Sequence, residues 1–370
     1  MTVTPIIVYF CKHRDMNPIP FLMSGFIAAN CWSLALYIGN PTNIIVAEAY
    51  QLTFYSYSYW MLLPAVAAGT VAFIGPYLYF RREISLPVAR KTEIIDSQNE
   101  ARKALKHPKS AIFGAVVLLS CLLALIVTSF MRISVWIATL PFALLMLARD
   151  ILFYVMHKPS KNEDDKVEMV DIAEIEKSTA IPSPENDLTA EQTASNLTSL
   201  QLPYLRQILS RMPWSIGPFI ISMFILVEAL DAGGWIALLA HGLRAIVHDK
   251  GVFPGVFGIG FITSLSCVVL NNQPMTILFT KIFLHRSFAC FVSPLELQSS
   301  MFALVMGSNF GANFALNGAL AGLMWNQILQ DLGVQGITYW RFMYMGTVLS
   351  APIVAAACLT LALELKPFSA

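Results

Sequence analysis

Runs of apolar residues, each about as long as a bilayer is thick, follow one another along almost the whole chain. A helix needs roughly 20 such residues to cross the hydrocarbon core. The pattern predicts an all-α polytopic membrane protein with membrane segments at 20–38, 59–80, 111–129, 133–156, 213–230, 252–285, 299–330 and 343–364. The segments 252–285 and 299–330 are too long for one simple crossing, and Asn, Gly and Pro interrupt them. We therefore predict a re-entrant hairpin at 252–285 and a broken helix at 299–330.

Polar amides stand in the middle of the first of these long segments. The run SLSCVVLNNQPMTIL (264–278) places Asn271, Asn272, Gln273 and Pro274 among apolar residues. An unpaired amide finds no water in hydrocarbon, so polar non-helical backbone at that depth is tolerated where it lines a cavity within the protein. These residues are typical of a binding site rather than of an ordinary loop.

Two further interruptions have the same character. YIGNPTN (37–43) follows an apolar run, and in GSNFGANFALNGALAG (307–322) an asparagine recurs every four residues, which on a helix would keep the three side chains near one face. Half-helix ends that meet in this way can offer bare N–H groups to a substrate. The predicted substrate-binding residues are Asn40, Asn43, Asn271, Asn272, Gln273, Thr276, Asn309, Asn313 and Asn317. The predicted helix breaks are at Gly39, Pro41, Pro274, Gly311 and Gly318.

Composition and charge restrict the class of protein. Hydrophobic residues make up 56% of the chain and charged residues 13%, and the mean hydropathy is +0.62. Of the 47 charged residues, 28 lie in 81–109 and 157–212. The basic segment 81–109 favours a cytoplasmic location for both polar segments. A net charge of +1 is too small to favour nucleic-acid binding.

These patterns predict four parts. Residues 1–80 end a first transport unit with a broken helix and the following span. Residues 81–156 form the basic loop and two scaffold spans, and residues 157–212 form a disordered acidic linker. Residues 213–370 form a second repeat, with an entry span, an interfacial helix, the hairpin, the broken helix and a last span.

The interrupted segments resemble one family. VVLNNQPMTILFTKI (268–282), GSNFGANFALNGALAGLMW (307–325) and NPTNIIV (40–46) are similar to the arsenite/antimonite efflux pumps of the ion transporter superfamily, with its citrate-transporter-like domain. FILVEAL (224–230) resembles the entry helix of the family's second half. The resemblance implies an inverted-repeat fold with re-entrant hairpins and broken helices, and transport by alternating access.

The first repeat departs from this pattern. TPIIV (4–8) resembles the tail of a hairpin's second arm, and the hairpin tip and the scaffold helices expected before it are absent. We expect an incomplete sequence, a gene model or isoform that starts at an internal methionine, and a genuinely shortened protein is the alternative.

The resemblance implies arsenite or antimonite as substrate. The polar motifs suit such a small uncharged hydroxylated acid, because amides both donate and accept hydrogen bonds, but silicic or boric acid would suit them equally. An intramembrane carboxylate is a candidate proton carrier, and Glu228 and Asp231 are the two candidates here. Lys281 either pairs with a carboxylate or reaches the surface.

Two alternatives stay open. One is a sodium- or proton-coupled carrier of dicarboxylate, citrate or silicic acid, or a cation/proton antiporter. The other is a non-transporting remnant. No catalytic, metal-site or cofactor motif is recognisable, so we expect no enzyme activity, no metal and no cofactor. The expected partners are a small-molecule or ion substrate and the lipid bilayer, with a homodimer and a cytoplasmic regulator on 157–212 as open hypotheses. The plasma membrane is favoured over an organelle membrane.

Overall fold

The computed structural model describes residues 3–14, 16–84, 108–130, 135–156, 214 and 216–368, and every regular element in them is helical. The predicted acidic linker at 157–212 and most of the basic loop at 81–109 lie outside the described residues. The chain divides into one unit formed by 1–106 with 215–370 and a second unit formed by 107–214.

The first part of the larger unit contains a helix that breaks. Its elements are α1 (Val3–His13), α2 (Ile19–Trp32), the 3-10 turns η1 (Ser33–Ala35) and η2 (Tyr37–Gly39), α3 (Pro41–Ala49) and α4 (Phe54–Phe80). The single span predicted at 20–38 is wrong in its second half, because the α-helix ends at Trp32 and two 3-10 turns follow. Asn40 then caps α3, with Pro41 at a position where a missing N–H costs nothing.

The second part of this unit begins after the linker. Its elements are α10 (Ile216–Ala232), α11 (Trp235–Val247), α12 (Val252–Leu270), α13 (Asn272–Leu284), α14 (Arg286–Ala289), α15 (Pro294–Phe310), η5 (Gly311–Asn313), η6 (Leu316–Gly318), α16 (Leu320–Asp331), α17 (Tyr339–Leu365) and η7 (Lys366–Phe368). Asn271 separates α12 from α13 with a φ of 67°, which residues with a Cβ rarely adopt. The long apolar segment 252–285 is therefore two helices joined at one asparagine.

The two broken helices repeat one local design. In the first, α2 leads into η1, an extended Leu36, η2, an extended Asn40 and then α3. In the second, α15 leads into η5, an extended Ala315, η6, an extended Ala319 and then α16. Each is followed by a 27-residue helix capped by a threonine, α4 or α17.

Glycine ends the second 3-10 turn in both designs, and the reason is the same. A Cβ on Gly39 would meet the backbone carbonyl of Ser33, and a Cβ on Gly318 would lie 2.8 Å from the carbonyl oxygen of Gly311. Each break folds back so closely on its first turn that no side chain fits there.

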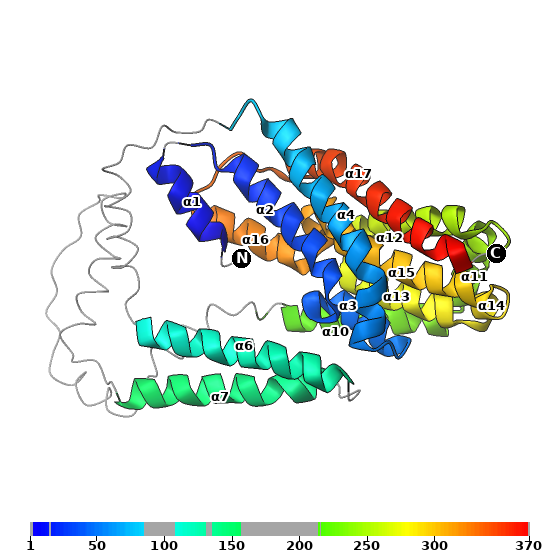
Figure 1. The fold of residues 1–370 in the computed structure, drawn as a ribbon, viewed down its shortest axis with the longest axis horizontal. Coiled ribbons are helices and arrows are strands. Elements are labelled where there is room, and N and C mark those ends of the chain that lie inside the picture. The colour runs from blue at the N-terminus through cyan, green and yellow to red at the C-terminus, as the bar shows by residue number, and fades with distance from the viewer. Residues whose placement is uncertain are drawn as a thin grey trace, which may run out of the picture. The chain divides into compact units, whose positions relative to one another are not determined.

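The core of the larger unit lies along α15. Helix α12 packs along it, α4 runs beside α17 (Figure 1), and residues 299–316 are all buried. Helix α13 packs against α3, and α1 packs against α16 in the corresponding way. This packing brings the two helix breaks together in the interior.

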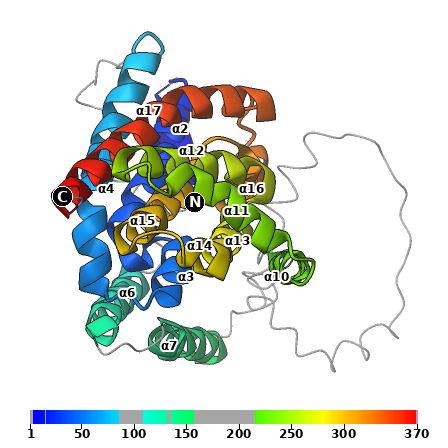
Figure 2. The same cartoon turned by 90° about the vertical axis from the view of Figure 1, so that its right-hand side faces the viewer.

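Three of the described helices, α4, α12 and α17, are long and apolar enough to cross a membrane. Helices α10 and α11 meet at a bend of 81°, with Gly233 and Gly234 between them (Figure 2). In the smaller unit, α6 (Pro108–Phe130) packs against α7 (Val135–Met156), where the Arg149 guanidinium lies 5.3 Å from the centre of the Phe113 ring.

Candidate functional site

Asn309, at the end of α15, is the centre of a buried hydrogen-bond network. Its Oδ1 accepts bonds from Ser33 Oγ at 2.7 Å and from Asn40 Nδ2 at 3.0 Å. Its Nδ2 donates to Asn43 Oδ1 at 2.7 Å and to the Val305 carbonyl at 2.8 Å. All four bonds of this amide are made, so Asn309 holds the two helix breaks against each other.

Asn43 and Asn40 supply the other side of the junction. Asn43 Nδ2 donates to the carbonyls of Ser33 and Leu36, which lie in the segment of 3-10 turns that follows α2. Asn40 Oδ1 accepts a bond from the Thr42 N–H at 3.3 Å as the N-cap of α3. These predicted site residues therefore have structural partners in this conformation.

Asn313, in η5, differs from its neighbours. Its Oδ1 accepts a bond from Asn30 Nδ2 at 2.7 Å. Its Nδ2 is buried and has no hydrogen-bond partner, although a buried amide normally has one. Within the described residues, Asn313 thus presents an unused donor at the meeting point of the breaks.

The junction of α12 and α13 lies against the break after α15. Asn271 Nδ2 donates to the Asn317 carbonyl at 3.0 Å, and Asn272 Nδ2 donates to the Ser308 carbonyl at 3.3 Å. Asn317 Nδ2 returns a bond to the Val268 carbonyl at 2.8 Å. The predicted hairpin tip and the predicted broken helix therefore bind each other through backbone carbonyls.

Gln273 and Thr276 make local hydrogen bonds at the start of α13. Gln273 is half-buried and donates its N–H to Asn271 Oδ1, and the buried Thr276 hydroxyl donates to the Asn272 carbonyl at 2.6 Å. Pro274 lies within the first turn of α13 rather than at the break itself, so the predicted break there is wrong by three residues, with Asn271 at the junction. Gly311 lies at the start of η5, where a Cβ would be 2.7 Å from the Ser264 carbonyl oxygen.

The prediction that the three asparagines spaced by four residues lie near one helical face is wrong. Asn309 lies in α15, Asn313 in η5 and Asn317 in η6, so the three do not share a helical face. The polar partners that sequence reasoning missed are Asn30, Ser33, Ser308 and Tyr339. The internal repeat is the signal that finds Asn30, since Asn30 and Asn309 each lie nine residues before the corresponding glycines, Gly39 and Gly318.

The electrostatics of this network are neutral. Every side chain that hydrogen-bonds within it, among the described residues, is an amide or a hydroxyl. A cavity of about 360 Å³ reaches Asn30 from between α1, α2 and α16, and its other lining residues, Thr4 apart, are apolar or glycine. The arrangement can bind a small polar molecule without a countercharge.

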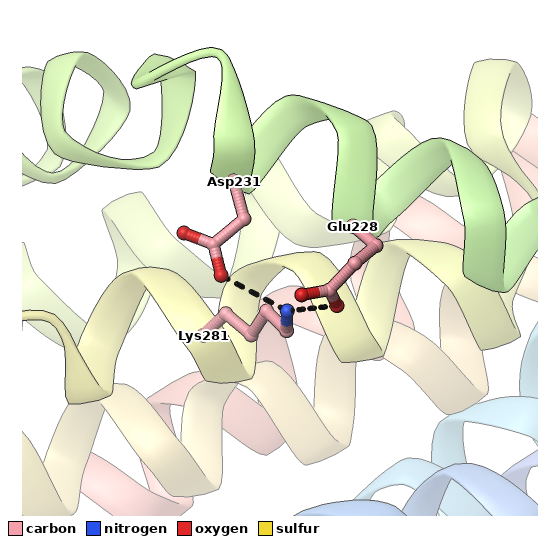
Figure 3. A network of polar contacts seen from close by, with 3 residues as sticks. All are labelled: Glu228, Asp231 and Lys281. Atoms are coloured by element: carbon pink, nitrogen blue, oxygen red, sulfur yellow. Dashed lines mark hydrogen bonds and ion pairs between the residues drawn. The ribbon is translucent and has the colours of Figure 1, made fainter.

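A second polar cluster lies between α10 and α13 (Figure 3). Lys281 Nζ contacts Glu228 Oε2 at 2.6 Å and Asp231 Oδ2 at 3.0 Å. The Lys281 side chain is 32% exposed, and the two carboxylates are 72% and 42% exposed. Both predicted proton-coupling candidates are thus paired with the lysine whose position the sequence left open.

One group of described residues has the composition of a metal site. His248, Asp249 and Glu296 have ligand atoms within 4.8 Å of one another. Both oxygens of Glu296 accept backbone N–H bonds, from Asp249 at 3.0 Å and from Ser293 at 2.8 Å, and the latter completes the capping box of α15. Helix capping accounts for this carboxylate.

Comparison with known proteins identifies the family. A family model described as "Citrate transporter" matches residues 1–307. This chain belongs to the citrate transporter family. Membership makes it an integral multi-pass membrane transporter, and it confirms the predicted all-α polytopic fold class.

Several relatives align with nearly the whole chain. "Arsenical pump membrane protein" of Escherichia coli is 25% identical over 369 residues, which are 99% of this chain and 72% of the relative. The protein of the same name from Yersinia enterocolitica is 25% identical over 370 residues with the same coverage. "46 kDa membrane protein" of Mycobacterium leprae is 24% identical over 359 residues, which are 96% of this chain and 70% of the relative. The resemblance to arsenical pumps is confirmed at this level.

Proposed function

We propose that this protein is a secondary active transporter that exports a small uncharged hydroxylated metalloid acid, such as arsenite or antimonite, across the plasma membrane. Several relatives that align over nearly the whole chain bear the name arsenical pump membrane protein. The observation that carries the proposal is the buried neutral amide network with the unused donor of Asn313.

The chemistry of the substrate fits this network. Arsenite is an uncharged trihydroxide at neutral pH, and each hydroxyl both donates and accepts a hydrogen bond. Asn313 Nδ2 offers a donor, and Asn272 Oδ1 accepts no bond from the described residues. Amide side chains are neutral, so a neutral substrate needs no countercharge here. An amide can replace its bond to another amide by a bond to a substrate hydroxyl with little change in electrostatic energy.

The arrangement of helix ends supports alternating access as the transport mechanism. The starts of α3 and α13 and the end of α15 meet around the network. Such discontinuous helices are the usual site-forming elements of secondary transporters. In our proposal α13, α15 and the two breaks carry the substrate, and Glu228 or Asp231 carries a coupling proton.

A carboxylate carrier is the second candidate, because the family description names a citrate transporter. A citrate site would need several donors or a bound cation to balance the substrate's negative charge. Among the described residues, the hydrogen-bonding partners in the amide network include no cationic side chain. For this reason we favour the uncharged acid.

The test is transport by the purified full chain in proteoliposomes, with arsenite and labelled citrate compared at the same imposed proton gradient. We expect proton-dependent arsenite flux and no citrate flux. Asn272→Ala and Asn313→Ala are expected to lower arsenite flux at least tenfold. Gln327→Ala, at an exposed position on α16, is the matched amide control. If both site variants transport arsenite at the wild-type rate, the proposed location of the binding site is wrong. If the wild type transports citrate and no arsenite, the second candidate function is right and the first is wrong.

A further inference from the structure

Two fully buried side chains of the described residues each carry a polar atom that has no hydrogen-bond partner. One is Asn313 Nδ2, in η5, and the other is Ser350 Oγ, in α17. Neither residue has any exposed surface. Buried polar atoms are normally bound by protein, by ordered water or by a ligand. Each of these two atoms can therefore take a hydrogen bond from a molecule that is not part of the chain.

Helix α17 approaches η5 most closely at Gly346. A Cβ on Gly346 would meet the carbonyl oxygen of Asn313. Ser350 follows Gly346 by four residues, which is about one helical turn and about 6 Å along the helix at 1.5 Å per residue. Its side chain therefore leaves α17 on the same side as this contact. The two unpartnered groups lie beside one contact between α17 and η5.

The first broken helix has an apolar residue at the position that corresponds to Asn313. Asn313 precedes Gly318 by five residues, and Leu34 precedes Gly39 by five residues in the corresponding turn. Leu34 is buried as completely as Asn313. The backbone design of a break is therefore compatible with an apolar side chain at this position.

The long helix after the first break likewise has an apolar residue at the position that corresponds to Ser350. Ser350 follows the capping Thr338 by 12 residues, and Ala65 follows the capping Thr53 by 12 residues. Ala65 is fully buried too. An unpartnered buried polar group lowers stability, and the first half shows that the fold does not need one at either position. Such a departure from good packing is typical of a functional site.

The ligand that suits these two groups is a small neutral molecule with several hydroxyl groups. The amide nitrogen of Asn313 donates a hydrogen bond, and the Ser350 hydroxyl can donate and accept one. Both groups are uncharged and buried, so a charged ligand would lose its hydration here without gaining a countercharge. The cavity of about 360 Å³ reaches Asn30, whose amide binds Asn313, so space for a small molecule lies one side chain away.

We propose that Ser350 binds a hydroxyl group of the substrate together with Asn313, so that α17 contributes a binding residue to the site between the two helix breaks. This assignment rests on the proposed function, and it adds to that site a residue from a helix that is otherwise unbroken. The substrate then supplies the hydrogen bonds that both side chains lack in the substrate-free protein.

Binding to the purified full chain in detergent tests the assignment without transport. Arsenite and boric acid, both uncharged trihydroxides at neutral pH, are the probes, and equilibrium dialysis measures their dissociation constants. We expect Ser350→Ala and Asn313→Ala each to raise the dissociation constant about tenfold. Because both residues bind the same small molecule, the double variant should raise it by less than the product of the two single effects.

Ser300→Ala is the matched control. Ser300 lies on α15, is fully buried like Ser350 and donates its hydroxyl to the Glu296 carbonyl at 2.8 Å. This variant should leave both dissociation constants unchanged and lower the melting temperature by about 2 °C. In the ligand-free protein, Ser350→Ala should instead leave the melting temperature unchanged or raise it, because it removes a buried hydroxyl that has no partner.

The proposal is wrong if Ser350→Ala binds both probes as the wild type does, and an ordered water is then the partner of this hydroxyl. It is also wrong if Ser350→Ala fails to fold or loses as much melting temperature as Ser300→Ala, because the hydroxyl then has a structural role. If the wild type binds boric acid and no arsenite, the proposed substrate is wrong, and the boric acid constants decide the role of Ser350. If the wild type binds neither probe, the proposed function and this assignment both fail.

Discussion

The break after α15 and the break after α2 have the same succession of 3-10 turns and extended residues, yet they differ in how they are covered. Around the second break, residues 299–316 are buried, and α12 contacts Gly307 and Gly311 closely through Thr263 and Cys267. Around the first, Gly25, Ala29 and Leu36 are exposed, and Trp32 is 51% exposed.

This difference shows that the local conformation of a break does not depend on a covering helix. Gly39 and Gly318 fold their turns back for the same steric reason in both places. The covering helix instead decides which side chains are buried, and thereby how much a substitution lowers the unfolding free energy. Substitutions near the two breaks can test this separation between conformation and coverage.

Gly311→Ala is expected to have a large effect. Its Cβ would lie 2.7 Å from the Ser264 carbonyl oxygen and 2.5 Å from Cys267 Sγ, so α12 must move away from α15. We expect a loss of about 3 kcal/mol in unfolding free energy, as for an overpacked core. Denaturation of the purified protein in detergent by SDS titration measures it.

Gly25→Ala is the matched change on α2. Its Cβ would meet only Ile7 Cδ1, at an ordinary distance of 3.6 Å. Alanine also favours the helix by up to about 1 kcal/mol over glycine, so equal or slightly higher stability is expected. A loss in Gly25→Ala as large as that in Gly311→Ala would mean that both breaks are covered to the same extent.

Asn309→Ala and Asn30→Ala compare the two asparagines at equivalent positions of the repeat. Asn309 makes four side-chain hydrogen bonds in a fully buried setting, whereas Asn30 is half-buried and donates one to Asn313. Removing the Asn309 amide leaves several buried partners without a hydrogen bond, so we expect Asn309→Ala to lower the unfolding free energy by about 3 kcal/mol. For Asn30→Ala we expect a loss of about 1 kcal/mol. The same SDS titration checks the order, and equal losses would contradict the central role of Asn309.

Gly69→Ala should also have a small effect. Its Cβ would approach the Trp32 ring at 2.7 Å, but this ring is half-exposed and can turn toward open space. We expect a change below about 1 kcal/mol and a shift in Trp fluorescence. A loss comparable to that of Gly311→Ala would show that Trp32 is held as rigidly as the core.

Several particulars of the fold could be predicted from the chain alone. The polar runs around Asn40, Asn271 and Asn309 mark where helices break, because amides in an apolar run are costly unless the backbone uses them. The sequence did not reveal that Asn309, Asn313 and Asn317 lie in three separate elements, because a four-residue spacing suits a helix equally well. Asn30 and Ser33 were missed because a single polar residue in an apolar helix carries no such signal.

The sequence by itself determined the membrane setting, the all-α class and the places where apolar helices are interrupted, since these follow from the hydrophobicity and backbone chemistry of neighbouring residues. Only the tertiary structure decided which amides are satisfied, that Asn313 has a spare donor, and that Lys281 joins Glu228 and Asp231. Those properties depend on contacts between residues up to 283 positions apart, and packing, rather than local pattern, sets such distances.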